Sequence, residues 1–266
     1  MPKARVGEIQ LDYERSGEGP PLLAIMGMSG TALHWGEPFL SRLRESFEVI
    51  VYDHRGVGSS SRLEGPITIA RMAADAVGLV RALELDSVHL LGISMGGMVA
   101  QELVLANPEL VRTLTLGCTY CGGPGSSYGS AARDRLYEAM SSGDRVRALR
   151  AAYEINLSPA AAADPELWER FQSIAAERAV AVPVIMAQVA ACFQHDTHAR
   201  LPDVSAPTLV IHGTADEMIP VQNGRLIASL VPGARLKLFE EVGHLFFWEQ
   251  PAATAELVRS HAAVPA

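Results

Sequence analysis

Short apolar runs alternate along most of the chain with longer segments of helical periodicity. Residues 22–26, Leu-Leu-Ala-Ile-Met, are apolar at every position and are followed directly by Gly27. Such a run is typical of a strand buried on both faces of a parallel sheet. Further strand-like runs lie at 49–52, 88–91, 113–116, 208–211 and 236–239, and a more polar edge hairpin is expected near 6–13. The pattern predicts an α/β fold, an open and mostly parallel sheet of about eight strands with helices on both faces.

The alternation stops between residues 121 and 200. This segment is rich in Ala, Arg and Glu with helical spacing, and it begins with the breaker sequence Gly122-Gly-Pro-Gly. We expect a helical cap over 121–200, inserted into a core formed by 1–120 and 201–266. An insertion at the carboxyl edge of a parallel sheet lies where such sheets bind ligands.

Composition excludes several classes of protein. The chain has 266 residues, 48% of them hydrophobic, and a net charge of −8, so one sizeable core is expected and no nucleic-acid partner. Three cysteines make no disulfide framework, which favours a reducing cytoplasm, and no apolar stretch of signal-peptide length opens the sequence. The longest apolar tract, 179–193, contains Pro183 and is too short to span a membrane. The sequence indicates no oligomeric state.

The motif Gly92-Ile-Ser94-Met-Gly96 stands between an apolar strand and a helical segment. In that context it predicts a strained turn that lifts the Ser94 hydroxyl above the sheet edge. Only small residues fit two positions either side of the serine, which accounts for Gly92 and Gly96. Backbone N–H groups at the start of the following helix are then free to hold an oxyanion.

A serine hydroxyl is a weak nucleophile and needs a base that is oriented by an acid. Asp216 follows the strand at 208–211, and His244 follows the strand that ends at Phe239. Both residues are therefore expected in loops at the same sheet edge as Ser94. Glu217 is an alternative acid, but adjacent loop side chains usually diverge, so Asp216 is preferred.

In these features the chain resembles the α/β-hydrolase superfamily from end to end, and its chain order Ser, Asp, His is that of this fold. The branch with a serine nucleophile includes carboxylesterases, enol-lactonases, carbon–carbon bond hydrolases and cofactor-free haloperoxidases. The resemblance implies that Ser94 is the nucleophile, His244 the general base and then acid, and Asp216 the residue that orients the imidazole. It also implies an oxyanion hole made by the backbone N–H groups of Met28 and Met95. The histidine that usually opens the family's oxyanion loop is replaced by Met26.

Several apolar residues are candidates for the substrate pocket, and each could instead fill the core. The resemblance places Met26 and Met218 near the reaction centre, and Phe246 follows His244 closely. From the cap, Tyr128, Trp168 and Met186 are added. The cap residues Arg145, Arg147 and Arg150 could receive a substrate carboxylate, although a solvated helix face explains them better because residues two apart on a helix diverge.

No metal and no cofactor are expected. His195 and His198 have a chelate-like spacing but no third clustered ligand, and Cys118-Thr-Tyr-Cys121 does not open a helix as a redox motif would. The glycine-rich turns complete neither a dinucleotide fingerprint nor a phosphate loop.

We therefore expect a serine hydrolase that cleaves a small carboxylic ester or lactone through an acyl-enzyme. Neutral substrates of medium size are favoured. A carbon–carbon bond hydrolase and a cofactor-free perhydrolase or haloperoxidase stay open on the same residues. A non-catalytic ligand-binding relative is the remaining alternative, disfavoured because nucleophile, base and acid are all present.

Overall fold

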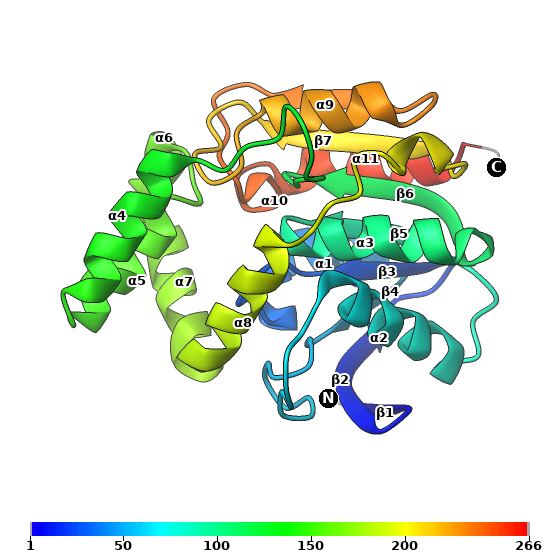
Figure 1. Cartoon of the computed structure of the whole chain (residues 1–266), viewed down its shortest axis with the longest axis horizontal. Helices are drawn as coiled ribbons and strands as arrows, with labels where there is room; N and C mark the ends of the chain where they lie inside the picture. The colour runs from blue at the N-terminus through cyan, green and yellow to red at the C-terminus, as the bar shows by residue number, and fades with distance from the viewer. Residues whose placement is uncertain (1, 265–266) are drawn as a thin grey trace.

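The centre of the molecule is one eight-stranded sheet in the order β1-β2-β4-β3-β5-β6-β7-β8 (Figure 1). The computed structural model describes residues 2–264. The strands are β1 Lys3–Val6, β2 Ile9–Ser16, β3 Pro21–Ile25, β4 Glu48–Tyr52, β5 Val88–Ile93, β6 Val111–Gly117, β7 Thr208–Gly213 and β8 Arg235–Phe239. All neighbouring pairs from β4 to β8 are parallel, whereas β1 and β2 form an antiparallel hairpin at one edge. The predicted fold class is confirmed.

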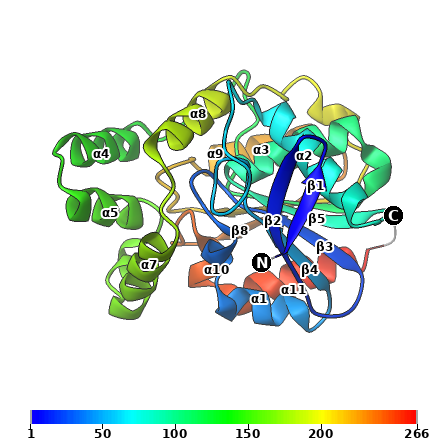
Figure 2. The same ribbon diagram turned by 90° about the horizontal axis from the view of Figure 1, so that it is seen from below.

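Helices cover both faces of the sheet because its central strands are apolar on both sides (Figure 2). One face carries α2 Ile69–Ala82, α3 Met95–Ala106 and α9 Gln222–Leu230. The other face carries α1 Glu37–Arg44, α10 Phe246–Glu249 and α11 Pro251–Ala262. Short 3₁₀ helices lie at Ala32–Trp35, Pro108–Leu110 and Leu201–Asp203. The two resulting apolar cores leave the carboxyl ends of the strands free for loops.

Five α-helices lie between β6 and β7 in the described chain, and we call them the cap. They are α4 Ser130–Ser141, α5 Arg145–Glu154, α6 Pro159–Ala162, α7 Pro165–Glu177 and α8 Val182–Phe193. Local signals start them: Asp144 accepts hydrogen bonds from the N–H groups of Val146 and Arg147, and Asp164 accepts one from Glu166. Figures 1 and 2 both show α4, α5 and α7 at one end of the molecule, with α8 running back along the core.

Within residues 2–264, no single helix has both the length and the apolar character needed to cross a membrane. The helices α7 and α8 pass that test only when taken together, and they are bent by 109° relative to each other.

Candidate active site

Ser94 occupies a strained turn between β5 and α3. Its φ of 54° lies in the left-handed region, which a residue with a side chain adopts only when its surroundings hold it there. Its N–H donates to the carbonyl oxygen of Gly117 at 2.8 Å, and its own carbonyl oxygen accepts from the Thr119 hydroxyl at 2.6 Å and from the N–H of Gly97 at 2.9 Å. Ser94 is thus fixed from three sides.

Two glycines make room for this turn. A Cβ atom at Gly96 would clash with the carbonyl oxygen of Ile25 in β3, and one at Gly92 would clash with the carbonyl oxygen of Gly96. Both obstacles are backbone atoms, which cannot move aside as the end of a side chain could. The glycine spacing noted in the sequence therefore follows from the close approach of α3 to two strands.

Asp216 and His244 form a buried pair at the carboxyl ends of β7 and β8. The Nδ1 atom of His244 lies 2.7 Å from Oδ2 of Asp216. The other carboxylate oxygen accepts from the N–H groups of Met218 and Ile219, both at 2.9 Å. Burial alone would raise the pKa of the Asp216 carboxyl, but the charge of His244 and hydrogen bonds from His212 and His244 outweigh it. The pKa of Asp216 is held well below its ordinary value, so the carboxylate stays ionised.

The loop that carries His244 is held partly by the cap. The N–H of Leu245 donates to the carbonyl oxygen of Asn156 at 2.8 Å, and Gly243 packs directly against the backbone of Leu157. Among residues 2–264, no hydrogen bond joins the Ser94 hydroxyl to His244. The two side chains share the carboxyl edge of the sheet, where β5 and β8 both end.

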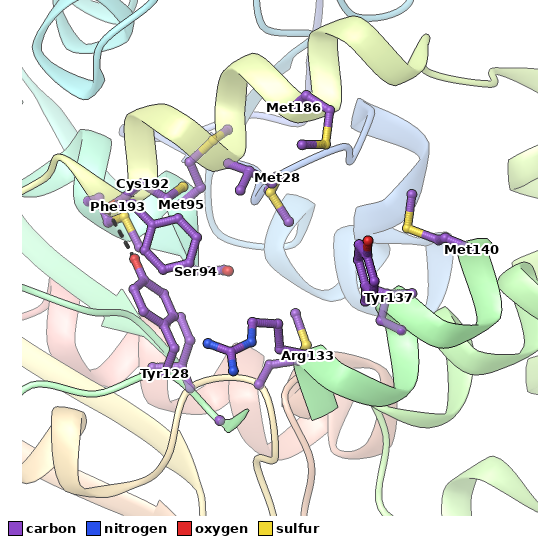
Figure 3. A pocket seen from close by; sticks show the side chains of 16 residues that line it. Met28, Ser94, Met95, Tyr128, Arg133, Tyr137, Met140, Met186, Cys192 and Phe193 are labelled. Atoms are coloured by element: carbon purple, nitrogen blue, oxygen red, sulfur yellow. Dashed lines mark hydrogen bonds between the residues drawn. The ribbon is translucent and has the colours of Figure 1, made fainter. Parts of the chain in front are cut away.

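A cavity of about 300 Å³ opens beside Ser94. Figure 3 shows the serine hydroxyl pointing into the space between α8 side chains, such as Met186, and α4 side chains, such as Tyr137. The lining is almost wholly apolar, and six of its sixteen residues are methionines: Met28, Met95, Met98, Met140, Met186 and Met218. Flexible, polarizable methionines let such a wall adapt to ligands of different shape.

Comparison with known proteins settles the family. A sequence model described as the Alpha/beta hydrolase family matches residues 25–257. The chain belongs to this family. It is 30% identical to a protein described as the putative carbamate hydrolase RutD of Azorhizobium caulinodans, over 97% of each chain. It is 28% identical to the putative non-heme bromoperoxidase BpoC of Mycobacterium tuberculosis, over 92% of this chain and 94% of the relative.

The solved structure of Est816, described as an N-acyl homoserine lactone degrading enzyme, is similar throughout. Its TM-score to this chain is 0.77 and its sequence identity 26%, with 97% of this chain and 99% of Est816 covered. Together these relatives establish a hydrolase-family protein whose homologues act on small molecules. They carry several different reactions on one fold, so the fold alone does not select a substrate.

Met28 and Met95, the residues predicted to supply the oxyanion hole, both line the cavity. Met95 opens α3 directly after Ser94, and Met28 follows Gly27, where a Cβ atom would come within 3.0 Å of the Ser94 Cβ. Within the described part of the chain, neither N–H donates a hydrogen bond to another residue. Two backbone donors without acceptors, next to the serine that lines the same cavity, are available to a bound ligand.

The structure brings only part of the predicted pocket to this cavity. Met218, Tyr128 and Met186 line it. Met26, Phe246 and Trp168 do not. Met26 turns into the core beside Gly30, Phe246 is fully buried against Gly117 and Phe239, and Trp168 stacks on Phe171 and contacts Tyr153 within the cap. Large apolar side chains near a site are often buried in the adjacent core, and their position in the sequence does not show this.

The arginine at the cavity is Arg133, which the sequence analysis did not single out. Its guanidinium is hydrogen-bonded to the adjacent Asp134, at 3.1 and 3.2 Å, and it is the charged member of the lining. Arg147 pairs with Glu138, and Arg150 stacks over the ring of Trp168, 4.8 Å from its centre. The available signal was helical spacing, because Arg133, Tyr137 and Met140 recur at i, i+4 and i+7 on one face of α4.

Cys118, Cys121 and His195 are buried, and Cys118 lies close to two further side chains of the kinds that bind metals. Ligand atoms of Cys118, His212 and Asp216 lie within 4.8 Å of one another. Burial and the nearby Asp216 charge raise the pKa of the Cys118 thiol well above its ordinary value, so among these protein groups alone the side chain is a neutral thiol. In the segment joining cap to core, His195 is buried near Gln101, whereas His198 is only half-buried.

Proposed function

We propose that this protein is a serine hydrolase that cleaves a carboxylic ester or lactone through an acyl-enzyme. The observation that carries the proposal is the strained Ser94 at the wall of an apolar cavity, beside two unpaired backbone N–H groups and at the same sheet edge as the Asp216–His244 pair. Each component has a defined task in acyl transfer.

In the proposed reaction the Ser94 hydroxyl oxygen attacks the carbonyl carbon while His244 accepts the hydroxyl proton. The negative charge that develops on the carbonyl oxygen is held by the N–H groups of Met28 and Met95. The carbon–oxygen bond then breaks, and the leaving alkoxide takes the proton from His244. Water attacks the acyl-enzyme in a second round of the same transfers and releases the acid.

Asp216 supports this cycle without changing its own charge. Its lowered pKa keeps it ionised, so it fixes the imidazole orientation and stabilises the imidazolium that forms in each transition state. The two backbone N–H groups that bind its other oxygen hold the carboxylate in place.

The shape and polarity of the cavity favour neutral substrates of medium size. Its walls are apolar, and the one cation among the lining residues, Arg133, is paired with Asp134, so the lining offers no unpaired cation to an anionic substrate. The printed descriptions of relatives range from lactone degradation to carbamate hydrolysis, and the bromoperoxidase name supports a second candidate. In that candidate the same acyl-enzyme reacts with hydrogen peroxide instead of water, giving a peracid.

The test is covalent labelling followed by kinetics. A fluorophosphonate should add once to the protein, and peptide mass spectrometry should place the adduct on Ser94. Ser94→Ala and His244→Ala should each lower ester hydrolysis by roughly four to six orders of magnitude, because the three residues act as a unit. Ser260→Ala, which changes a serine of α11, is the matched control. Retention of more than about a tenth of the activity in Ser94→Ala would remove the nucleophile assignment.

A further inference from the structure

Gln188 of the cap is buried against the loop that carries Met28. Its side chain has no exposed surface, and its Oε1 atom accepts a hydrogen bond from the N–H of Ser29 at 2.8 Å. Its Nε2 atom has no hydrogen-bond partner within residues 2–264. Burying the unpaired Nε2 atom costs free energy, which suggests that the hydrogen bond made by Oε1 has a role beyond packing.

The receiving segment is a four-residue turn. The N–H of Gly30 donates to the carbonyl oxygen of Gly27 at 3.2 Å and closes it. Ser29 occupies the third position with a φ of 57°. Four-residue turns with a positive φ at the third position normally have glycine there, because a side chain makes the left-handed region unfavourable. Ser29 is therefore held in a conformation that its own backbone does not favour.

The hydrogen bond from Gln188 acts on the peptide group that decides this conformation. The N–H of Ser29 belongs to the peptide between Met28 and Ser29. In the competing turn type, with a negative φ at the third position, that peptide is reversed and its N–H points the other way. An acceptor on the cap side stabilises the observed orientation only. The backbone of Met28 is thereby fixed on its carboxyl side.

We propose that Gln188 is a positioning residue that holds the oxyanion-stabilising N–H of Met28 in place from the cap. This inference rests on the proposed function, because it concerns the loop that would bind the oxyanion. The same helix, α8, also presents Met186 and Val189 to the cavity. One rigid element therefore contacts the substrate and orients a donor for the transition state.

The decisive variant is Gln188→Met, which keeps length and volume but removes the acceptor. We expect kcat to fall about 10- to 100-fold with KM within threefold, since a displaced donor weakens transition-state binding more than substrate binding. Affinity for a trifluoromethyl ketone, whose adduct carries the oxyanion, should fall in parallel. Gln194→Met, the same change at an exposed site just after α8, should alter none of these values.

A second variant separates positioning from general damage. Glycine adopts a positive φ without strain, so Ser29→Gly should make the turn independent of Gln188. The double variant Ser29→Gly/Gln188→Met should recover kcat to within about threefold of Ser29→Gly alone. An equal loss of kcat in both backgrounds, or a Gln188→Met protein whose kcat is unchanged, would overturn the proposal.

The hydrogen bond to the turn can also be measured without an activity assay. Hydrogen exchange at the Ser29 amide should become at least tenfold faster in Gln188→Met, because its acceptor is gone. Unchanged exchange would count against the proposal even if kcat fell. Fluorophosphonate labelling of the wild-type Ser94 reports separately on the proposed function, so failure of labelling is distinguishable from failure of the Gln188 assignment.

Discussion

The carboxyl edge of the sheet and the outer part of the cap differ in how tightly their residues are held. At the sheet edge, Ser94 and Asp216 are each held by three or more hydrogen bonds, and His244 is buried. In α4, only two alanines are buried, and the side chain of Tyr137 is 74% exposed. For the proposed function, the difference means that the scaffold would fix the reacting groups, whereas the surface that would meet the substrate is open to change.

Besides its contact with the loop of His244, the cap is attached to the core on both sides of the cavity. On one side α8 reaches Ser29 through Gln188, and the guanidinium of Arg178 lies 3.0 Å from the buried carboxylate of Asp53. On the other side the N–H of Gly129, just before α4, donates to the carbonyl oxygen of Met218 at 2.9 Å. Met218 follows Asp216 by two residues. Each wall of the cavity is therefore joined to one of the loops proposed to act in catalysis.

The largest expected difference between the two regions concerns their glycines. Gly96→Ala should reduce ester hydrolysis by more than about a thousandfold, because the new Cβ meets the backbone of β3 and must displace the turn at Ser94. In the cap, Gly143 has a positive φ, of 72°, but no atom lies within 4 Å of an added Cβ. Gly143→Ala should cost only the backbone strain, about 1 kcal/mol of unfolding free energy. Hydrolysis rates and urea titrations check both.

If Gly96→Ala kept a tenth of the wild-type rate, the turn at Ser94 would accommodate the added Cβ, and the sheet edge would be less rigid than we infer. A similar loss of rate in Gly143→Ala would also contradict the inferred difference, since the outer cap would then be as sensitive to substitution as the sheet edge.

The next largest effect is expected at the wall of the cavity. Tyr137→Ala and Met186→Ala should each shift the preferred acyl length of a p-nitrophenyl ester series toward longer chains, with individual rates changing by about tenfold. Fluorophosphonate labelling of Ser94 should be unaffected, because the probe needs little of the wall. Val146→Ala is the matched control, since Val146 is an exposed apolar residue of the cap that does not line the cavity. An unchanged ranking in both cavity variants would remove the cap from substrate selection.

The smallest effect is a pH dependence of stability located where cap and core join. Burial lowers the pKa of His195 to about 4, against an ordinary value of 6.5. Between these two values the unfolded chain binds a proton that the folded chain does not, so stability falls as the pH drops from about 6.5 to 4. The slope is at most about 1.4 kcal/mol per pH unit for this one residue. Urea unfolding of the wild type and of His195→Gln at pH 7 and pH 5 measures it.

In His195→Gln, the number of protons taken up on unfolding between pH 4 and 6.5 should be smaller by up to one, so the unfolding free energy should fall less steeply with acid. Above pH 7.5 the two proteins should show parallel pH profiles. An equally steep acid decline in His195→Gln would assign the effect to other buried groups, such as His34 and His89, whose pKa burial likewise lowers to about 4.

The fold and the family could be predicted because their signals are local. A strand buried on both faces must be apolar throughout, as residues 22–26 are, and the turn at Ser94 needs glycine at two nearby positions. The positions of Asp216 and His244 after their strands could also be predicted, because parallel strands bring their carboxyl ends to one edge. The roles of these three residues remain predictions from that arrangement.

The sequence by itself determined the alternation of elements, the order of Ser94, Asp216 and His244, and the interruption of the sheet by a helical segment. Only the tertiary structure decided which apolar residues reach the cavity. It turned Phe246 into the core, stacked Trp168 inside the cap and brought Arg133 and Gln188 to the site. The physical reason is that helical spacing defines a face but not the partner of that face. The contact between Gln188 and Ser29 joins residues 159 positions apart, and no local pattern encodes it.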